Sequence, residues 1–237
     1  MSLVTYLLSS IKFIGGPGSL GFFLAGVLAA GVAARYWPAR RRLAAVAFGL
    51  LVMSYVVLAL PSVGIGLVNA LPASPEPPTE AIRGIRALVI FDGDNRIGRQ
   101  RRAHQVLRQV SPPDVWVLGP EYLVADVRVA LTGTTRLHHD ATTWNTSAQV
   151  ERVQYVAAQW PPMTTAVIAS RIQMPRIASM FDAAGLAVLL VPSGLDREVA
   201  VSGPKSLIPS FAALAASREA IYEHAALAWY RWRGDIE

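Results

Sequence analysis

A long apolar run near the amino terminus constrains this chain most. All but two of the eighteen residues from Leu43 to Leu60 are hydrophobic, and the apolar character continues with few breaks to Val68. At a rise of 1.5 Å per residue, such a run just crosses a hydrocarbon core about 30 Å thick. An earlier run, Leu20 to Ala34, is shorter and equally free of charge. Both runs have the composition of membrane-spanning helices.

We predict two transmembrane helices, at about residues 17–35 and 43–68, within a membrane region of residues 1–70. The alternative for the first run is a cleaved signal peptide, which needs a basic start and a small-residue cleavage site. Only Lys12 precedes the run, and the sequence after it, "RYWPARRR", resembles no such site. Residues 3–14 form either a short interfacial helix or an extension of the first span.

The basic residues of this region predict its orientation. The outer flanks hold only Lys12 before the first run and no basic residue before Arg83 after the second. The segment between the runs carries four arginines: Arg35, Arg40, Arg41 and Arg42. By the positive-inside rule this segment is cytoplasmic. We therefore expect a multi-pass protein of the bacterial inner (cytoplasmic) membrane, with its soluble part on the periplasmic or outer side. The absence of cysteine is compatible with that compartment.

A proline-rich spacer separates the membrane region from the rest of the chain. The stretch "LPASPEPPTE" has four prolines in ten residues, a composition that favours an extended, semi-rigid conformation. We assign residues 71–82 to a linker. Residues 83–237 then form the soluble part, which is long enough for one well-packed domain.

Short apolar runs alternate with helical patterns in this domain. The predicted strands are residues 87–91, 115–119, 165–170 and 187–192, and the predicted helices are 99–110, 146–160 and 174–184. This alternation indicates an α/β fold, a three-layer α/β/α domain with a mainly parallel, Rossmann-like sheet. Ligands of such sheets bind at the carboxyl ends of the strands, which here are followed by "DGDNRIGR", "GPEY" and "SRIQMPR".

Several of these segments resemble one known family. Two amino-terminal spans, a basic loop, a proline-rich spacer and an outer α/β domain with an S-x-x-[HQ]-x-P-R turn look like the YdcF-like family of unknown function, in its membrane-anchored ElyC and SanA form. The clearest segments are "ASRIQMPRIASMFDAAGL" and "WNTSAQV". The closing region with Glu223 and the position of Arg99 are also similar. The resemblance implies a role in cell-envelope biogenesis, in peptidoglycan, lipid-carrier or exopolysaccharide metabolism.

Departures from the family pattern bear on catalysis. The family's histidine in the S-x-x-H turn is Gln173 here, and its glycine cluster after the first strand is replaced by "FDGDN". The family's acidic residue on the second helix has no sure counterpart, and Asp126 is the nearest. A glutamine amide does not exchange protons at neutral pH, whereas histidine does. If the family's histidine is an acid or base, this chain lacks it.

The remaining polar residues suit an anion. Helix amino termini and arginine side chains bind phosphate oxygens. The predicted ligand-binding residues are Arg99, Thr146, Ser170, Arg171, Gln173 and Arg176, with Asp92, Gly93, Asp94 and Asn145 as secondary candidates. The structural alternative is that the arginines pair with nearby aspartates and only stabilise turns. We expect no cofactor.

Other motifs point less clearly to chemistry. Asp92 and Asp94 could bind a divalent cation, but an acidic pair in a glycine turn is more often turn chemistry, so we predict no metal site. The histidines of "LHHD" (138–140 with Leu137) are read as solvated loop residues, since no third ligand accompanies them. The basic helix "GRQRRAHQVLRQ" is a solvated face or lies near anionic lipid. A nucleic-acid partner is not expected outside the cell.

The sequence leaves two functions open. The first is a non-catalytic binding or assembly subunit of an envelope polysaccharide machine, with a phosphate-bearing, lipid-linked precursor as ligand. The alternative is a phosphoester hydrolase or transferase that acts on such a precursor. Loss of the histidine and of the glycine cluster favours the first, and the chain has no P-loop and no complete dinucleotide fingerprint.

Overall fold

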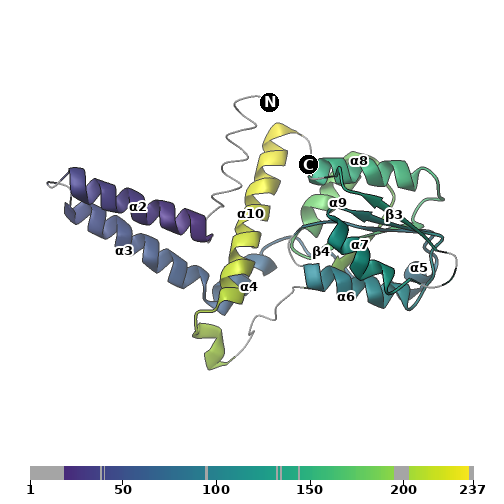
Figure 1. Cartoon of the computed structure of the whole chain (residues 1–237), viewed down its shortest axis with the longest axis horizontal. Coiled ribbons are helices and arrows are strands. Elements are labelled where there is room, and N and C mark those ends of the chain that lie inside the picture. Colours follow the sequence, from purple (N-terminus) through teal and green to yellow (C-terminus); the bar gives the residue numbers. More distant parts are fainter. Residues whose placement is uncertain are drawn as a thin grey trace. The chain divides into compact units, whose positions relative to one another are not determined.

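The chain divides into two compact units. A computed structural model describes residues 19–37, 39, 41–93, 96–131, 133, 135–143, 145–194 and 203–234. The first unit comprises Met1–Leu71 and Arg197–Ala225, and the second comprises Pro72–Asp196 and Ala226–Glu237. The long helix α10 (Phe211–Arg233) contributes to both units (Figure 1).

The first unit contains an antiparallel helical hairpin. Its helices are α2 (Leu20–Tyr36) and α3 (Arg41–Leu58). The Tyr55 hydroxyl of α3 donates a hydrogen bond of 2.5 Å to the Ser19 carbonyl, at the start of α2. Gly26 allows close packing between the helices, because a Cβ there would lie 2.6 Å from a methyl carbon of Leu51. The two apolar runs of the sequence therefore pack side by side.

One helix of the described chain, α3, is long and apolar enough to cross a membrane, and α2 is apolar but has 17 residues. The prediction of two transmembrane helices is thus supported for one helix and not confirmed for the other. The predicted span 43–68 is also interrupted. Helix α3 ends at Leu58 and a new helix, α4 (Pro61–Asn69), begins with Pro61 in its first turn. Proline has no N–H to continue a preceding helix but fits the first turn of the next one. The alternatives for residues 3–14 lie outside the described residues.

Helix α10 packs against the end of this hairpin through small residues. The Ser210 N–H donates to the Ala59 carbonyl at 2.8 Å, and the Ser217 hydroxyl donates to the Leu58 carbonyl at 2.7 Å. The buried face of α10 in this unit carries three alanines: Ala213, Ala216 and Ala220. Their spacing of three and four residues places them on one helix face, so the start of α10 is fixed to the end of α3.

The second unit is built on a five-stranded, all-parallel sheet. Its strands are β1 (Ala87–Ile90), β2 (Asp114–Leu118), β3 (Arg136–Asp140), β4 (Thr165–Ser170) and β5 (Leu189–Ser193). They lie in the order β3-β2-β1-β4-β5. Ala87 of β1 is in register with Asp114 of β2 on one side and with Thr165 of β4 on the other. The predicted parallel, Rossmann-like α/β fold is confirmed.

Helices cover both faces of the sheet (Figure 1). Helices α6 (Arg96–Leu107) and α7 (Glu121–Arg128) pack on one face, and α8 (Thr146–Ala157) and α9 (Met174–Ala183) pack on the other. Helix α8 begins at Asn145, whose side-chain oxygen accepts a hydrogen bond of 2.8 Å from the Ala148 N–H. Such a cap satisfies one of the donors that a helix leaves unpaired at its amino terminus.

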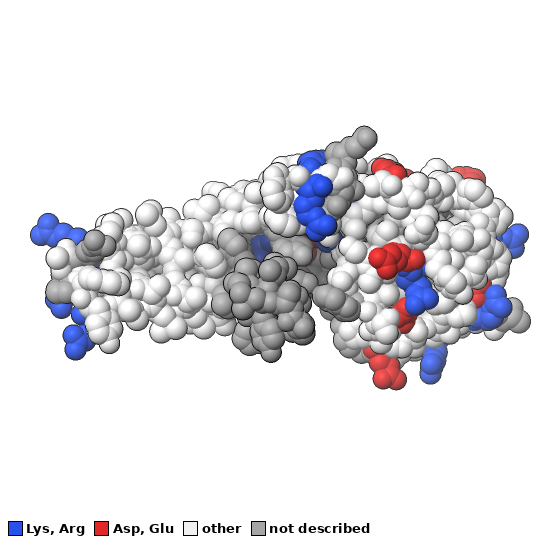
Figure 2. Space-filling model, turned by 90° about the horizontal axis from the view of Figure 1, so that it is seen from above, with Lys and Arg blue, Asp and Glu red and all other residues white. Residues whose placement is uncertain are grey.

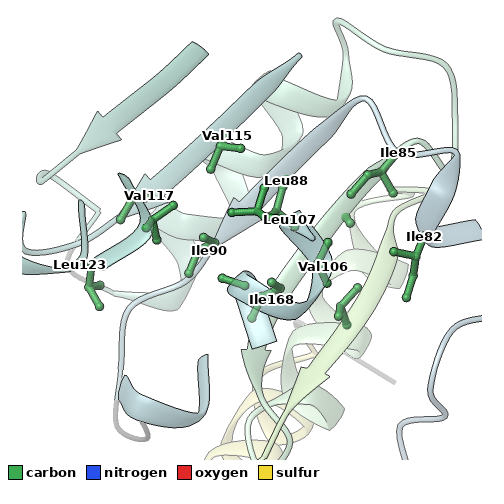
Figure 3. Close-up of a cluster of buried hydrophobic side chains, with 14 of the residues drawn as sticks. Ile82, Ile85, Leu88, Ile90, Val106, Leu107, Val115, Val117, Leu123 and Ile168 are labelled. Atoms are coloured by element: carbon green, nitrogen blue, oxygen red, sulfur yellow. The ribbon is translucent and has the colours of Figure 1, made fainter. Parts of the chain in front are cut away.

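Alternate residues of the buried strands face the two helix layers. Leu88 and Ile90 of β1 join the core beneath α6 and α7 (Figure 3), whereas Ala87 and Val89 join the core beneath α8 and α9. All four are at most 2% exposed. Strands buried on both faces read as continuous apolar runs, which is why the sequence predicts β1 and β4 well.

Several elements differ from the sequence prediction. The short helix α7 and the strand β3 were not expected. The "LHHD" residues, predicted to lie in a solvated loop, form the edge strand β3 and pair with β2. The spacer is also tied to the domain, because Glu76 forms an ion pair with Arg102 of α6. Residues 79–82 of the predicted linker, together with Arg83, form a short helix, α5 (Thr79–Arg83).

Candidate functional site

The strand order places a topological switch point between β1 and β4, and we call the carboxyl ends of these two strands the β1/β4 crevice. The chain leaves β1 for α6 on one face of the sheet and leaves β4 for α9 on the opposite face. At such a topological switch point, the two connections diverge and leave room at the carboxyl ends of the strands. Asp92 and Gly93 after β1 and the predicted turn "SRIQMPR" after β4 therefore flank the same crevice.

Gly93, Arg99 and Gln173 meet at this crevice. A guanidinium nitrogen of Arg99, in α6, donates to the Gly93 carbonyl. A Cβ on Gly93 would lie 2.8 Å from Nε2 of Gln173 and 3.5 Å from Nη1 of Arg99. Gly93 also has a φ of +139°, which only glycine adopts readily. The glycine therefore lets the turn after β1 approach the Gln173 amide closely.

A second contact joins the first turns of α8 and α9. Nη1 of Arg176 donates to Oγ1 of Thr146 at 2.6 Å. Arg176 is 5% exposed and Arg99 is 0% exposed. The backbone at the start of α9 adds donors, because the first N–H groups of a helix have no partner within it. Two buried guanidinium groups and a helix amino terminus thus lie at the carboxyl edge of the sheet.

The other predicted residues are placed differently. Ser170, at the end of β4, is buried, and its carbonyl accepts the Gln173 N–H at 2.9 Å. The Arg171 side chain is exposed, so it is not brought together with Arg99 and Arg176. Asn145 is used as the cap of α8. Asp94 lies outside the described residues.

The turns after β1 and β2 are in direct contact. Gly119 follows β2 with a φ of +125°, and a Cβ there would lie 2.4 Å from Cβ of Asp92. The Gly119 N–H donates to the Asp140 carbonyl at 2.9 Å. The Gly119 carbonyl accepts a hydrogen bond of 2.7 Å from Nε2 of His139. Gly119 is therefore held by contacts with Asp92, Asp140 and His139, and it packs against Asp92 at the edge of the crevice.

This arrangement suits binding better than proton transfer. Guanidinium groups donate several hydrogen bonds in a plane and match phosphate or carboxylate oxygens. The side-chain amide of Gln173 has donors and an acceptor, but it does not act as an acid or base near neutral pH. Asp126, the nearest counterpart of the family's acidic residue, is held in an ion pair with Arg96 at 2.5 Å.

A polar hollow beside α8 was not predicted from the sequence. It has a volume of about 280 Å³ and is lined by Thr142, Thr143, Ala148, Glu151, Arg152 and Tyr155. Asp140 closes β3 next to it and forms an ion pair of 2.5 Å with Arg152. Hydrogen bonding from Thr142 and the charge of Arg152 lower the pKa of the Asp140 carboxyl, against the effect of burial. The D-x-T pattern at residues 140–142 was the available signal, since aspartate often caps the turn after a strand.

A buried carboxylate of β2, Asp114, lies beside the opposite end of β3. Asp114 accepts hydrogen bonds of 2.8 and 2.9 Å from Arg136 and one of 2.8 Å from His138. Burial raises the pKa of Asp114, but these hydrogen bonds and charges outweigh it, so the pKa is lower than usual. His138 stacks on Trp116 with ring centroids 4.2 Å apart. The predicted loop histidine is therefore a structural partner of Asp114.

In comparisons with known proteins, no family model, curated protein or solved structure matches the chain. The resemblance to the YdcF-like family and the function that it implies therefore stay predictions.

Proposed function

We propose that this protein is a membrane-anchored, extracytoplasmic subunit of envelope biogenesis that binds a phosphate group at the β1/β4 crevice without turning it over. The observation that carries the proposal is the meeting of Gly93, Arg99 and Gln173 at the switch point. Arg176, bound to Thr146, lies in the first turn of the helix that follows Gln173. The group at the centre of this arrangement is a neutral amide.

The surface of the α2–α3 hairpin supports the membrane anchor. In Figure 2 the hairpin, at the left, is white along its length and shows the blue of basic residues at its far end, where α2 ends with Arg35 in its last turn and α3 begins at Arg41. Large apolar residues such as Leu28, Leu43 and Leu50 are 68%, 66% and 66% exposed. A soluble protein rarely exposes so much contiguous apolar surface, and lipid would cover it. We propose that α2 and α3 both span the membrane, with Arg35, Arg41 and Arg42 on the cytoplasmic side.

The proposed ligand is a phosphate-bearing, lipid-linked envelope precursor. Two buried guanidinium groups favour an anion over a neutral sugar or peptide. A membrane-anchored domain meets lipid-linked substrates by diffusion in the plane of the bilayer. Subunits of an envelope polysaccharide machine are the corresponding protein partners.

Binding of inorganic phosphate and of a short-chain polyprenyl phosphate to the purified full chain tests the site. Arg176→Ala should weaken binding by about 1.5 to 3 kcal/mol, the range for hydrogen bonds to charged groups, and Gln173→Ala by about 1 kcal/mol. Arg101→Ala is the matched control, because it removes an equal charge from the exposed side of α6. Equal losses for Arg176→Ala and Arg101→Ala would mean that only general charge attracts the anion.

Turnover separates binding from catalysis. The unmodified chain should leave the phosphoester of the polyprenyl phosphate intact. Steady hydrolysis or transfer by the unmodified chain that Gln173→Ala abolishes would contradict the proposal and favour a hydrolase or transferase.

A further inference from the structure

The turn that leads into α10 exposes a group of apolar side chains. Leu207, Ile208 and Phe211 are 67%, 59% and 72% exposed, and Pro209 between them is also exposed. We call these four residues the 207–211 patch. No charged residue occurs from Ser206 to Ser217. Contiguous exposed apolar residues mark a surface that another molecule covers.

Backbone contacts fix this patch at one end of α3. Ser210, within the patch segment, donates its N–H to the Ala59 carbonyl at 2.8 Å. Further along α10, Ser217 donates to the Leu58 carbonyl at 2.7 Å. Leu58 is the last residue of α3. The patch therefore lies at the level where the proposed membrane-spanning helix ends, opposite the end that carries Arg41 and Arg42.

The chemistry of the surrounding surface favours lipid as the covering molecule. The end of a spanning helix lies at the boundary between hydrocarbon and headgroups, where apolar and aromatic side chains are favoured. Tyr222 of α10 is 55% exposed and follows Phe211 by eleven residues, which is close to three helical turns and so the same helix face. An apolar segment continued by an exposed tyrosine is the pattern expected at a membrane interface.

We propose that the 207–211 patch inserts into the interfacial region of the leaflet in which α3 ends, as a membrane contact in addition to the hairpin. This inference rests on the proposed membrane anchor. The insertion ties the start of α10 to the bilayer surface, and the hydrogen bonds of Ser210 and Ser217 hold it at the depth at which α3 ends.

Site-directed spin labelling of the full chain tests the insertion, because the chain has no native cysteine. Leu207→Cys and Ile208→Cys are labelled singly and reconstituted in vesicles of phosphatidylethanolamine with a minority of phosphatidylglycerol. Leu50→Cys on α3 serves as the control for hydrocarbon, and Val129→Cys, at an 84% exposed position of the second unit, as the control for water. Collision rates with oxygen and with a water-soluble nickel chelate report the depth of each label.

We expect labels at 207 and 208 to meet the nickel chelate less often than the label at 129 and more often than the label at 50, with oxygen access retained. Nickel access equal to that at 129, with the label at 50 protected, would overturn the insertion and leave the hairpin intact. Immobilised labels at 207 and 208, shielded from both reagents, would also overturn it, because a second copy or another protein then covers the patch. A label at 50 as accessible to nickel as that at 129 would refute the membrane anchor itself, and the insertion with it.

Discussion

Replacing Gly119 by alanine tests whether the turns after β1 and β2 must touch to build the crevice. Alanine at this position meets two obstacles. Its φ of +125° is unfavourable for any residue with a Cβ. The new Cβ would also lie 2.4 Å from Cβ of Asp92, whereas carbon atoms in contact are normally about 3.5 to 4.0 Å apart. The Asp92 atom is close to the backbone, so a rotamer change does not relieve the clash.

The cost can be worked out from these two obstacles. A strained backbone conformation costs about 1 to 3 kcal/mol, and forced overpacking costs about 1 to 3 kcal/mol more. Gly119→Ala should therefore destabilise the second unit by about 2 to 6 kcal/mol, a large share of the 5 to 15 kcal/mol typical of a domain. Gly185→Ala is the matched control, because Gly185 has a φ of +65° and no atom lies within 4 Å of its Cβ position. The control should lose about 1 to 2 kcal/mol from strain alone.

Native-state hydrogen exchange of β1 and β2 amides in the full chain measures both losses, since core strands exchange by global unfolding of their unit. Adding Asp92→Gly to Gly119→Ala removes the clashing Cβ and should restore about 1 to 3 kcal/mol, the overpacking part of the loss. The reasoning is refuted if Gly119→Ala costs no more than Gly185→Ala, or if Asp92→Gly restores nothing.

Two further predictions concern acid stability and topology. Because the pKa of Asp114 is lower in the folded chain than its usual value, its stabilising contribution is present above the unfolded pKa of about 3.9 and is lost as the pH falls through the folded value. Asp114→Asn should thus destabilise the second unit at neutral pH and reduce the stability that this unit loses in acid. Urea unfolding at several pH values measures both effects. An unchanged dependence of the unfolding free energy on pH in the acid range would contradict this. Reporter fusions after Trp37 and at the carboxyl terminus should give opposite signals, and a cytoplasmic signal from the carboxyl-terminal fusion would contradict the proposed orientation.

Strands buried on both faces could be predicted from the sequence, and the edge strand could not. Residues 87–90 and 166–169 are continuous apolar runs because helices cover both faces of their strands. Strand β3 reads "RLHHD", and only its last residue is buried. It is a strand because β2 pairs with it over five residues. That pairing joins residues more than twenty positions apart, so no local pattern of apolar residues reports it.

The edge of the sheet that carries the candidate residues could be predicted from the sequence, but the contacts among these residues could not. Parallel strands predict that the turns with Arg99, Gln173 and Arg176 lie at one edge of the sheet. Which side chains meet depends on the strand order and on the side-chain conformations. Arg176 turns to Thr146, Arg99 turns back to the Gly93 carbonyl, and Arg171 points to solvent. Gly93 and Gly119 could be identified as turn glycines, yet the need for close approach at each of them arises only from the packing.

The position of Gln173 next to Arg99 makes the Gln173→His variant informative about catalysis. Nε2 of Gln173 and Nη1 of Arg99 both lie within 3.5 Å of the position that a Cβ on Gly93 would take. A histidine at 173 would therefore lie beside a guanidinium group, and a neighbouring positive charge lowers the pKa of an imidazole below its ordinary value of about 6.5. Such a histidine is neutral at pH 7 and can accept a proton. If Gln173→His still does not hydrolyse phosphoesters, the lack of hydrolysis cannot be explained by an imidazole that is already protonated and so unable to act as a base. The crevice would then lack other parts of a catalytic site as well, as expected of a subunit that only binds its phosphate ligand.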